Sequence, residues 1–139
     1  MSFGRNVRFA SLLIASMAIV TLVGCSRGGS AGLTRVTGEV KLNGQPLKSG
    51  TITFMPVSGT TSSTGEIKDG RYSLGTTTPG DGAPAGEYEV SVTAWEKLPT
   101  MTEAGVPAVP EKYMNADTSG LTAKVESQRS QTIDFDLQP

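Results

Sequence analysis

The sequence has 139 residues, with 12 basic and 13 acidic side chains, one cysteine and no histidine. This length suits a single domain. Without histidine, Ser-His-Asp and Cys-His catalysis and histidine-based zinc sites are excluded, and a net charge of −1 without a basic stripe argues against nucleic-acid binding. The 17 glycines, 8 prolines and 6% aromatic residues indicate a turn-rich, all-β chain.

Residues 1–24 have the composition of a signal peptide. Arg5 and Arg8 form a positively charged start, and an uncharged apolar run over residues 9–23 follows. The run is too short and wrongly flanked for a membrane-spanning helix. We therefore expect this segment to direct export and to take no part in the fold.

The apolar run ends in the sequence LVGC, residues 22–25, which resembles the bacterial lipobox. That resemblance implies that Cys25 is acylated with chains such as palmitate and becomes the first mature residue after cleavage. Ser26 after the cysteine then implies sorting to the outer membrane. Residues 25–32 would form a short lipidated tether before a domain over residues 33–139. The alternative is a buried cysteine in an uncleaved anchor helix.

From Leu33 onward, apolar and polar residues alternate, which is typical of half-buried β-strands. Strands are predicted over residues 35–42, 50–56, 86–96, 121–126 and 132–137, and a strand pair over residues 65–75. Asn43-Gly44 and Asp69-Gly70 are typical of tight turns, and inward-facing Gly38 predicts a bulge or a close backbone approach. Seven short strands without a convincing helix favour a β-sandwich with one core.

Residues 97–120 show neither the helical nor the strand period of apolar residues, and they contain several prolines. We predict an ordered loop that packs over an edge of the sandwich, with Tyr113 as its apolar anchor. Trp95 and Tyr113 are also candidate ligand contacts, because two aromatic rings can form a stacking platform for a sugar or peptide. The favoured interpretation of Trp95 is a plug at the edge of the core.

Residues 34–95 resemble the carboxypeptidase regulatory-like domain. The matching positions are Val36, Gly38, Val40, Asn43, Gly44, Pro46, Leu47, Gly50, Ile52, Phe54, Gly70, Tyr72, Leu74, Gly86, Tyr88, Val90 and Val92. The resemblance implies a transthyretin-like, Greek-key β-sandwich that is an accessory rather than a catalyst. This sequence departs from the family at residues 63–74, STGEIKDGRYSL, where the residues of the family's usual acidic turn are distributed over a longer stretch.

The lipobox and the stretches PGDGAPAGEYEV and PEKYMNADTSGLTAKV further resemble small bacterial envelope lipoproteins that carry this domain. No peptidase domain accompanies these stretches. The resemblance therefore transfers no residue of a peptidase metal site.

Other polar motifs are better explained as turns, loops or solvent-exposed faces than as catalytic or ligand-binding sites. GDGAPAG, residues 80–86, is predicted to be a turn rather than a phosphate loop, because a strand and not a helix follows. GQPLKSG, residues 44–50, is predicted to be a loop between strands. The pairs Glu87/Glu89 and Asp134/Asp136 are predicted to lie on solvated outer faces; Ca²⁺ binding and glycoside hydrolysis are the alternatives.

These patterns predict a non-catalytic, lipid-anchored binding or structural module of the cell envelope, with no cofactor and no metal. Its partners would be the membrane, through the lipid, and an unidentified envelope protein or glycan. The loops around residues 57–64, 76–85 and 97–120 are the expected contact surfaces. The main alternative is a carbohydrate- or peptide-recognition accessory to a separate envelope enzyme. A small hydrolase is a third alternative, for which no nucleophile and base are found.

Overall fold

A computed structural model describes residues 32–139, so the predicted signal peptide and Cys25 lie outside the described residues. About half of the described residues lie in β-strands and very few lie in helices, which confirms the all-β class. Its elements are β1 (Leu33–Leu42), β2 (Gln45–Pro46), β3 (Ser49–Pro56), β4 (Ser63–Lys68), β5 (Arg71–Ser73), β6 (Ala83–Pro84), β7 (Gly86–Thr93), β8 (Trp95–Lys97), β9 (Val106–Pro107), the 3-10 turn η1 (Glu111–Met114), α1 (Ala116–Ser119), β10 (Leu121–Val125), β11 (Ser130–Thr132) and β12 (Phe135–Leu137).

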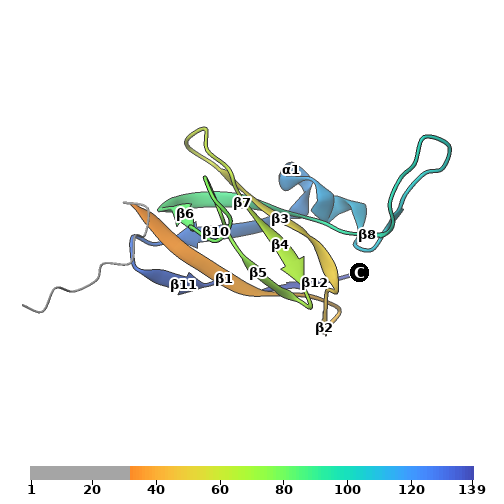
Figure 1. Ribbon diagram of the computed structural model, residues 1–139, viewed down its shortest axis with the longest axis horizontal. Coiled ribbons are helices and arrows are strands. Elements are labelled where there is room, and N and C mark those ends of the chain that lie inside the picture. The colour runs from red at the N-terminus through yellow and green to blue at the C-terminus, as the bar shows by residue number, and fades with distance from the viewer. Residues whose placement is uncertain (1–31) are drawn as a thin grey trace, which may run out of the picture.

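The main sheet has the strand order β10-β7-β3-β4-β5-β1-β11, and β2, β6 and β12 also pair with β1. Every pairing in this sheet is antiparallel except those of β1 with β11 and β12, which are parallel. The sheet curls around one core, and β8 with β9 forms a separate hairpin that projects from the body (Figure 1).

The core lies inside the curl, and Phe54 on β3 is at its centre. The Phe54 ring centroid lies 5.7 Å from that of Tyr88, 6.0 Å from that of Phe135 and 6.3 Å from that of Tyr72. These rings come from four different strands, so one aromatic cluster joins distant parts of the sheet. Such tilted and edge-to-face pairs each add roughly 0.5–1.5 kcal/mol to the stability that area burial provides.

The predicted close backbone approach at Gly38 is confirmed. A Cβ atom at this position would lie 1.8 Å from the carbonyl oxygen of Ile133. Ile133 follows β11, and its N–H donates to the Thr37 carbonyl at 2.9 Å. Glycine is therefore required for the C-terminal strands to lie against β1.

Both predicted turns are confirmed by their backbone angles. Asn43 and Gly44 have φ values of 52° and 79°, and Asp69 and Gly70 have φ values of 50° and 81°. Two consecutive positive φ values are the geometry that Asn-Gly and Asp-Gly favour in two-residue hairpins. The hairpin between β4 and β5 thus forms despite its departure from the family's turn sequence.

Two predicted strands are interrupted. The strand expected over residues 86–96 breaks at Ala94, because the chain leaves its pairing with β3 after Thr93 and pairs with β9 instead. The strand expected over residues 132–137 divides into β11 and β12, because the Asp134 carboxylate, rather than a backbone carbonyl, accepts the N–H of Glu39.

Residues 97–120 are more regular than the expected loop. They contain β9, η1 and α1. Asn115 caps α1 by accepting the N–H of Asp117 at 3.1 Å, and Gly120 ends it in the left-handed conformation. Helices of four residues are too short to produce a helical period in the sequence. The predicted anchor is confirmed in the second half of the segment, where Tyr113 is 6% exposed and packs in the core.

The three loops predicted to be contact surfaces, around residues 57–64, 76–85 and 97–120, lie at opposite ends of the molecule. The β3–β4 loop and residues 75–85 lie near the start of β1, where the described chain begins. The β8–β9 hairpin lies at the other end, beside the C-terminus (Figure 1). A partner that contacts one group of loops is therefore distant from the other.

Candidate functional site

An open, shallow groove lies on the outer face of β1, β5 and β11. The residues that line it are Thr37, Gly38, Glu39, Arg71, Tyr72, Thr132 and Asp134. Tyr72 reaches the groove from the core, and the other polar side chains face outward because the alternate residues of these strands, such as Val36 and Val40, are buried in the core. Three paired strands thus present hydroxyl, carboxylate and guanidinium groups on one rigid surface.

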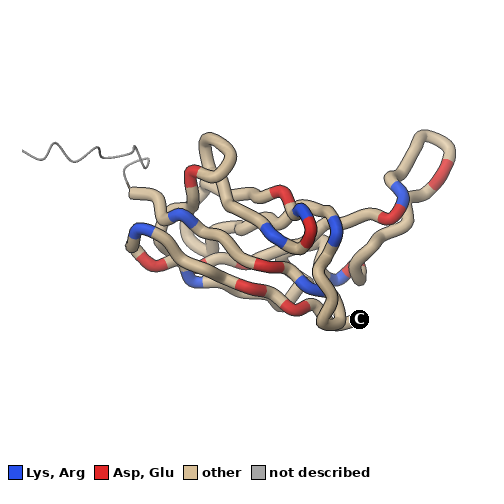
Figure 2. The backbone as a smooth tube through the Cα atoms, turned by 60° about the horizontal axis from the view of Figure 1, so that its bottom comes forward, with Lys and Arg blue, Asp and Glu red and all other residues tan. Residues whose placement is uncertain are grey.

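Charges of both signs meet in this groove. The Glu39 carboxylate lies 3.7 Å from Arg71 Nε and 3.7 Å from Lys41 Nζ. These side chains are 42% to 82% exposed, so the ion pairs contribute little stability and remain available to a ligand. Figure 2 shows the same mixture over the whole body, where acidic and basic residues alternate along the strands.

Tyr72 and Asp134 are held by hydrogen bonds to the backbone. The Tyr72 hydroxyl donates to the Ile133 carbonyl at 2.6 Å, and Asp134 accepts the Glu39 N–H at 2.8 Å. Burial raises the pKa of Tyr72 well above its ordinary value, and the nearby charge of Asp134 raises it further. Tyr72 is therefore a neutral hydrogen-bond donor across the accessible pH range.

The two predicted carboxylate pairs differ in what they contact. Glu87 and Glu89 are exposed on β7, as predicted. Asp134 and Asp136 are also exposed, but each accepts a backbone N–H from the region of β1: that of Glu39 at 2.8 Å and that of Gly44 at 3.1 Å. The aspartates attach the C-terminal strands to β1, a role that the alternating pattern of residues 133–137 did not reveal.

The first residues of GDGAPAG form a turn, as predicted, whereas Ala83–Pro84 form strand β6. The turn also contains an anion of the chain itself, the Asp81 carboxylate. The Asp81 carboxylate accepts the backbone N–H groups of Thr76, Thr77 and Thr78 at 2.6, 3.1 and 2.9 Å. Such a concave row of N–H groups is an anion-binding shape. These hydrogen bonds lower the pKa of Asp81. A carboxylate of the same chain thus already occupies this nest of three N–H groups, so the Gly-rich turn does not require a phosphate to pair them.

Trp95 and Tyr113, the candidate ligand contacts, lie in different environments. The Trp95 ring packs over Gly105, where a Cβ atom would come within 2.7 Å of the ring. The buried Tyr113 ring lies beneath the Lys112 ammonium, and its hydroxyl accepts the N–H of Gln138 at 3.0 Å. This placement favours packing roles. Of the two, the half-buried Trp95 is the one with a surface for a ligand.

The structure places no metal centre and no membrane span in the part of the chain that it describes. Residues 32–139 hold no group of three or more Asp, Glu, Cys or His side chains that could bind a metal ion together. Within the same residues, no helix has the length and apolar character needed to cross a membrane.

Comparison with known protein families and with curated proteins finds no match. Among solved structures, the chain is similar to the crystal structure of a 9R-lipoxygenase from Cyanothece, with a TM-score of 0.36 and 18% sequence identity. That similarity covers 78% of this chain and 16% of the lipoxygenase chain. It is too low to support an inference about function.

Proposed function

We propose that this protein is a non-catalytic module of the bacterial cell envelope, anchored at the outer membrane by acyl chains on Cys25, that binds partners or supports structure. The observation that carries the proposal is where the domain begins. Leu33 starts β1 at one end of the body, and residues 26–32 alone separate it from the lipobox cysteine. A lipid at Cys25 would hold that end of the domain next to a membrane.

The anchor is strong and short in physical terms. Each buried CH₂ of an acyl chain contributes about 0.8 kcal/mol, so several chains give stable attachment. Residues 26–32, which follow the lipobox cysteine, reach roughly 25 Å when fully extended. The anchored domain would therefore stay at the membrane surface, at a high effective concentration for other envelope components.

The proposed fold is the transthyretin-like sandwich of carboxypeptidase regulatory-like domains. It is supported by the curled sheet and by the burial of the apolar positions that carry the resemblance. The buried ones are Val36, Val40, Leu47, Ile52, Phe54, Tyr72, Leu74, Tyr88, Val90 and Val92. Proteins with this architecture serve many functions, so the site and not the fold has to identify a ligand.

The anchoring is tested by Cys25→Ser in the native host. We expect the wild-type chain in the membrane fraction, starting at Cys25 and carrying the mass of its acyl chains, and the variant outside that fraction without them. Ser26→Ala is the matched control, because it changes the neighbouring residue and leaves the acylated thiol. A Cys25→Ser variant that fractionates with membranes as the wild type does would overturn the proposal.

The second candidate is a carbohydrate- or peptide-recognition accessory, and the groove on β1, β5 and β11 favours it. Thr37, Glu39 and Arg71 offer donors and acceptors on a rigid sheet. We expect soluble peptidoglycan fragments to bind there, and Glu39→Gln to weaken binding. Glu89→Gln, an exposed change on β7, is the control. Equal calorimetric titrations for the wild type and both variants would remove this candidate.

A further inference from the structure

The turn between β1 and β2 places an Asn-Gly pair in the open. Asn43 and Gly44 form this turn, and both are exposed. An asparagine that precedes glycine can modify itself, because the next backbone nitrogen attacks the side-chain amide and glycine has no Cβ to hinder the attack. Apart from its neighbours in the chain, no atom of the described residues lies within 4 Å of the Cβ position at Gly44. The turn therefore leaves room for the ring that this attack forms.

Two comparable pairs among residues 32–139 are protected. Asp69-Gly70 occupies the same kind of turn, but the glycine is buried and its N–H donates to the Leu47 carbonyl at 2.7 Å. Asn115 precedes Ala116, whose side chain hinders the attack. The Oδ1 atom of Asn115 also accepts the Asp117 N–H at 3.1 Å, which holds its amide at the start of α1. The structure thus singles out Asn43 among the asparagines that it describes.

The Asp136 carboxylate holds the nitrogen that would attack. Asp136 lies on β12, beside the turn, and accepts the Gly44 N–H at 3.1 Å (Figure 1). The attacking species is the Gly44 nitrogen after it has lost its proton. A hydrogen bond to a carboxylate keeps that proton in place, and the negative charge disfavours the anion that would remain. The nitrogen and the carboxylate therefore have to separate before the turn can react.

We propose that Asn43 is a site of spontaneous deamidation and that Asp136 restrains the reaction. The Gly44 nitrogen bonds to Asn43 Cγ, the Cγ–Nδ2 bond breaks, and Nδ2 leaves as ammonia. The proton that the Gly44 nitrogen loses passes through solvent to the departing nitrogen. Water then opens the resulting succinimide at either carbonyl, which leaves aspartate or isoaspartate at position 43. The net change is the hydrolysis of a side-chain amide, for which water is the only co-reactant.

The isoaspartate product loosens the attachment of β12. In isoaspartate the main chain runs through the former side-chain carbonyl, which adds a CH₂ group to a two-residue turn. The pairing of Leu42 with Gln45, which frames the turn, then loses its register. The Asn43 N–H donates to the carbonyl of the buried Leu137 at 2.8 Å, so the same change pulls on β12. Deamidation at the surface is thereby linked to the packing of the C-terminal strand.

Peptide mapping by mass spectrometry tests the site. Full-length protein is incubated in detergent, and the fraction of each asparagine peptide that has exchanged NH₂ for OH is followed over time. We expect the exchange at Asn43, with Asn115 in the same molecules as the internal control. Exchange at Asn115 that is as fast as at Asn43 would overturn the proposal.

Hydrogen exchange tests the consequence for β12. The isoaspartate form, separated by chromatography, should exchange the amide hydrogens of residues 135–137 faster than the Asn43→Asp variant does. That variant carries the same added charge on an unaltered main chain, so it is the matched control. Equal exchange in the two proteins would contradict the link to the C-terminal strand.

Asp136→Ala tests the restraint. It should speed deamidation at Asn43 about fivefold, the factor that one hydrogen bond of ordinary strength represents. Asp134→Ala is the matched control, because Asp134 also attaches the C-terminal strands to β1, but through the Glu39 N–H. In urea the wild type and both variants should react at one common rate, since the fold no longer holds the turn. A folded Asp136→Ala variant that reacts no faster than the wild type, or no faster than Asp134→Ala, would overturn the proposal.

Discussion

The two ends of this molecule are built in opposite ways. At the end where β1 begins, the buried hydroxyl of Thr34 donates to the Glu126 carbonyl at 2.6 Å and accepts the Gln128 N–H at 3.3 Å. Gly82 packs so closely on Thr34 that a Cβ atom would lie 2.2 Å from its carbonyl oxygen. At the other end, the β8–β9 hairpin exposes apolar side chains and pairs only with itself.

Under the proposed anchoring, the difference separates two requirements of the module. The end where β1 begins has its segments fixed to one another, so a force on the proposed tether would act on a hydrogen-bonded, closely packed base. The far end keeps apolar surface free for contact. Mutations in the two regions should therefore differ in their effect on the free energy of unfolding: large in the packed end, and small in the exposed hairpin.

The largest effect on stability is expected from Gly38→Val. The side chain would collide with the Ile133 backbone, and we expect a loss of about 3 kcal/mol or more in the free energy of unfolding, measured by urea denaturation. Gly44→Ala is the comparison. Among the described residues no atom lies within 4 Å of a Cβ there, so only its positive φ opposes alanine. An equal loss for both would contradict the role assigned to close packing at Gly38.

Tyr72→Phe should have a moderate effect. It removes the hydroxyl that donates to the part-buried Ile133 carbonyl and leaves that acceptor without this partner, at a cost of about 1 kcal/mol. Thermal unfolding measures the change. Tyr88→Phe is the matched control, since its hydroxyl also donates to a backbone carbonyl, that of Pro84 at 2.7 Å, but within one short turn. A Tyr72→Phe variant as stable as the wild type would show that this bond does not hold the C-terminal strands.

Asp81→Asn should have a smaller effect that depends on pH. Because the pKa of Asp81 is lowered in the folded state, its carboxylate stabilises the fold above the pKa of the unfolded chain. That contribution is lost as the pH falls through the lower pKa of the folded state. The melting temperature of the variant should lie below that of the wild type at neutral pH and approach it in acid. A difference that stays constant with pH would contradict the role assigned to the charge.

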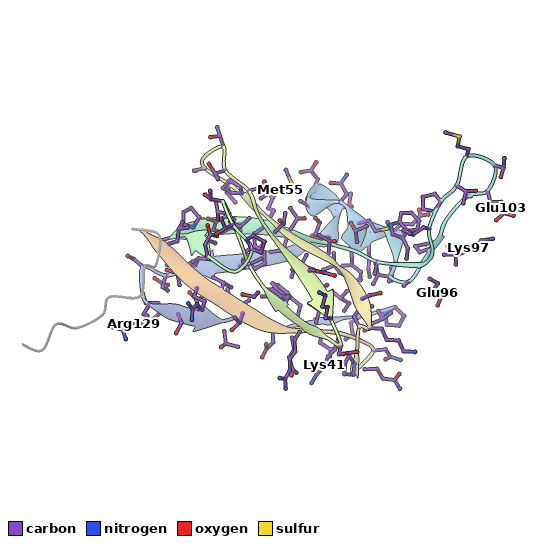
Figure 3. All side chains as sticks on the ribbon, in the orientation of Figure 1. Lys41, Met55, Glu96, Lys97, Glu103 and Arg129 are labelled. Carbon is purple, nitrogen blue, oxygen red and sulfur yellow. The ribbon has the colours of Figure 1, made fainter. Side chains whose placement is uncertain are left out.

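Leu98→Ser should have the smallest effect on stability. Its side chain is 69% exposed, so we expect a change within about 0.5 kcal/mol in the free energy of unfolding, measured by urea denaturation. Met55→Ser is the control, because Met55 is exposed on β3, away from the hairpin (Figure 3). A loss of more than about 1 kcal/mol for Leu98→Ser alone would show that the hairpin side chains contribute to the stability of the fold.

The features that the sequence predicted are those that neighbouring residues determine. Alternation identified the buried faces of Val36, Val40, Ile52 and Phe54, and both Gly-containing turns were correct. Gly38 was identified as a close approach because a glycine on the inward face of a strand leaves room for a neighbouring backbone.

The missed features depend on partners far along the chain. The exchange of partners at Ala94 and the backbone contacts of Asp134 and Asp136 join segments that only the fold brings together. The Asp81 nest is local, but it requires three consecutive N–H groups to converge, which composition does not reveal. The groove was missed because its residues come from three strands.

The central claim, a folded module held to a membrane by its N-terminus, is tested most directly by the intact mass of the protein extracted from membranes of its host. We predict a chain that begins at Cys25 and carries the added mass of its acyl chains. A chain that keeps residues 1–24 and has a free thiol at Cys25 would contradict the claim.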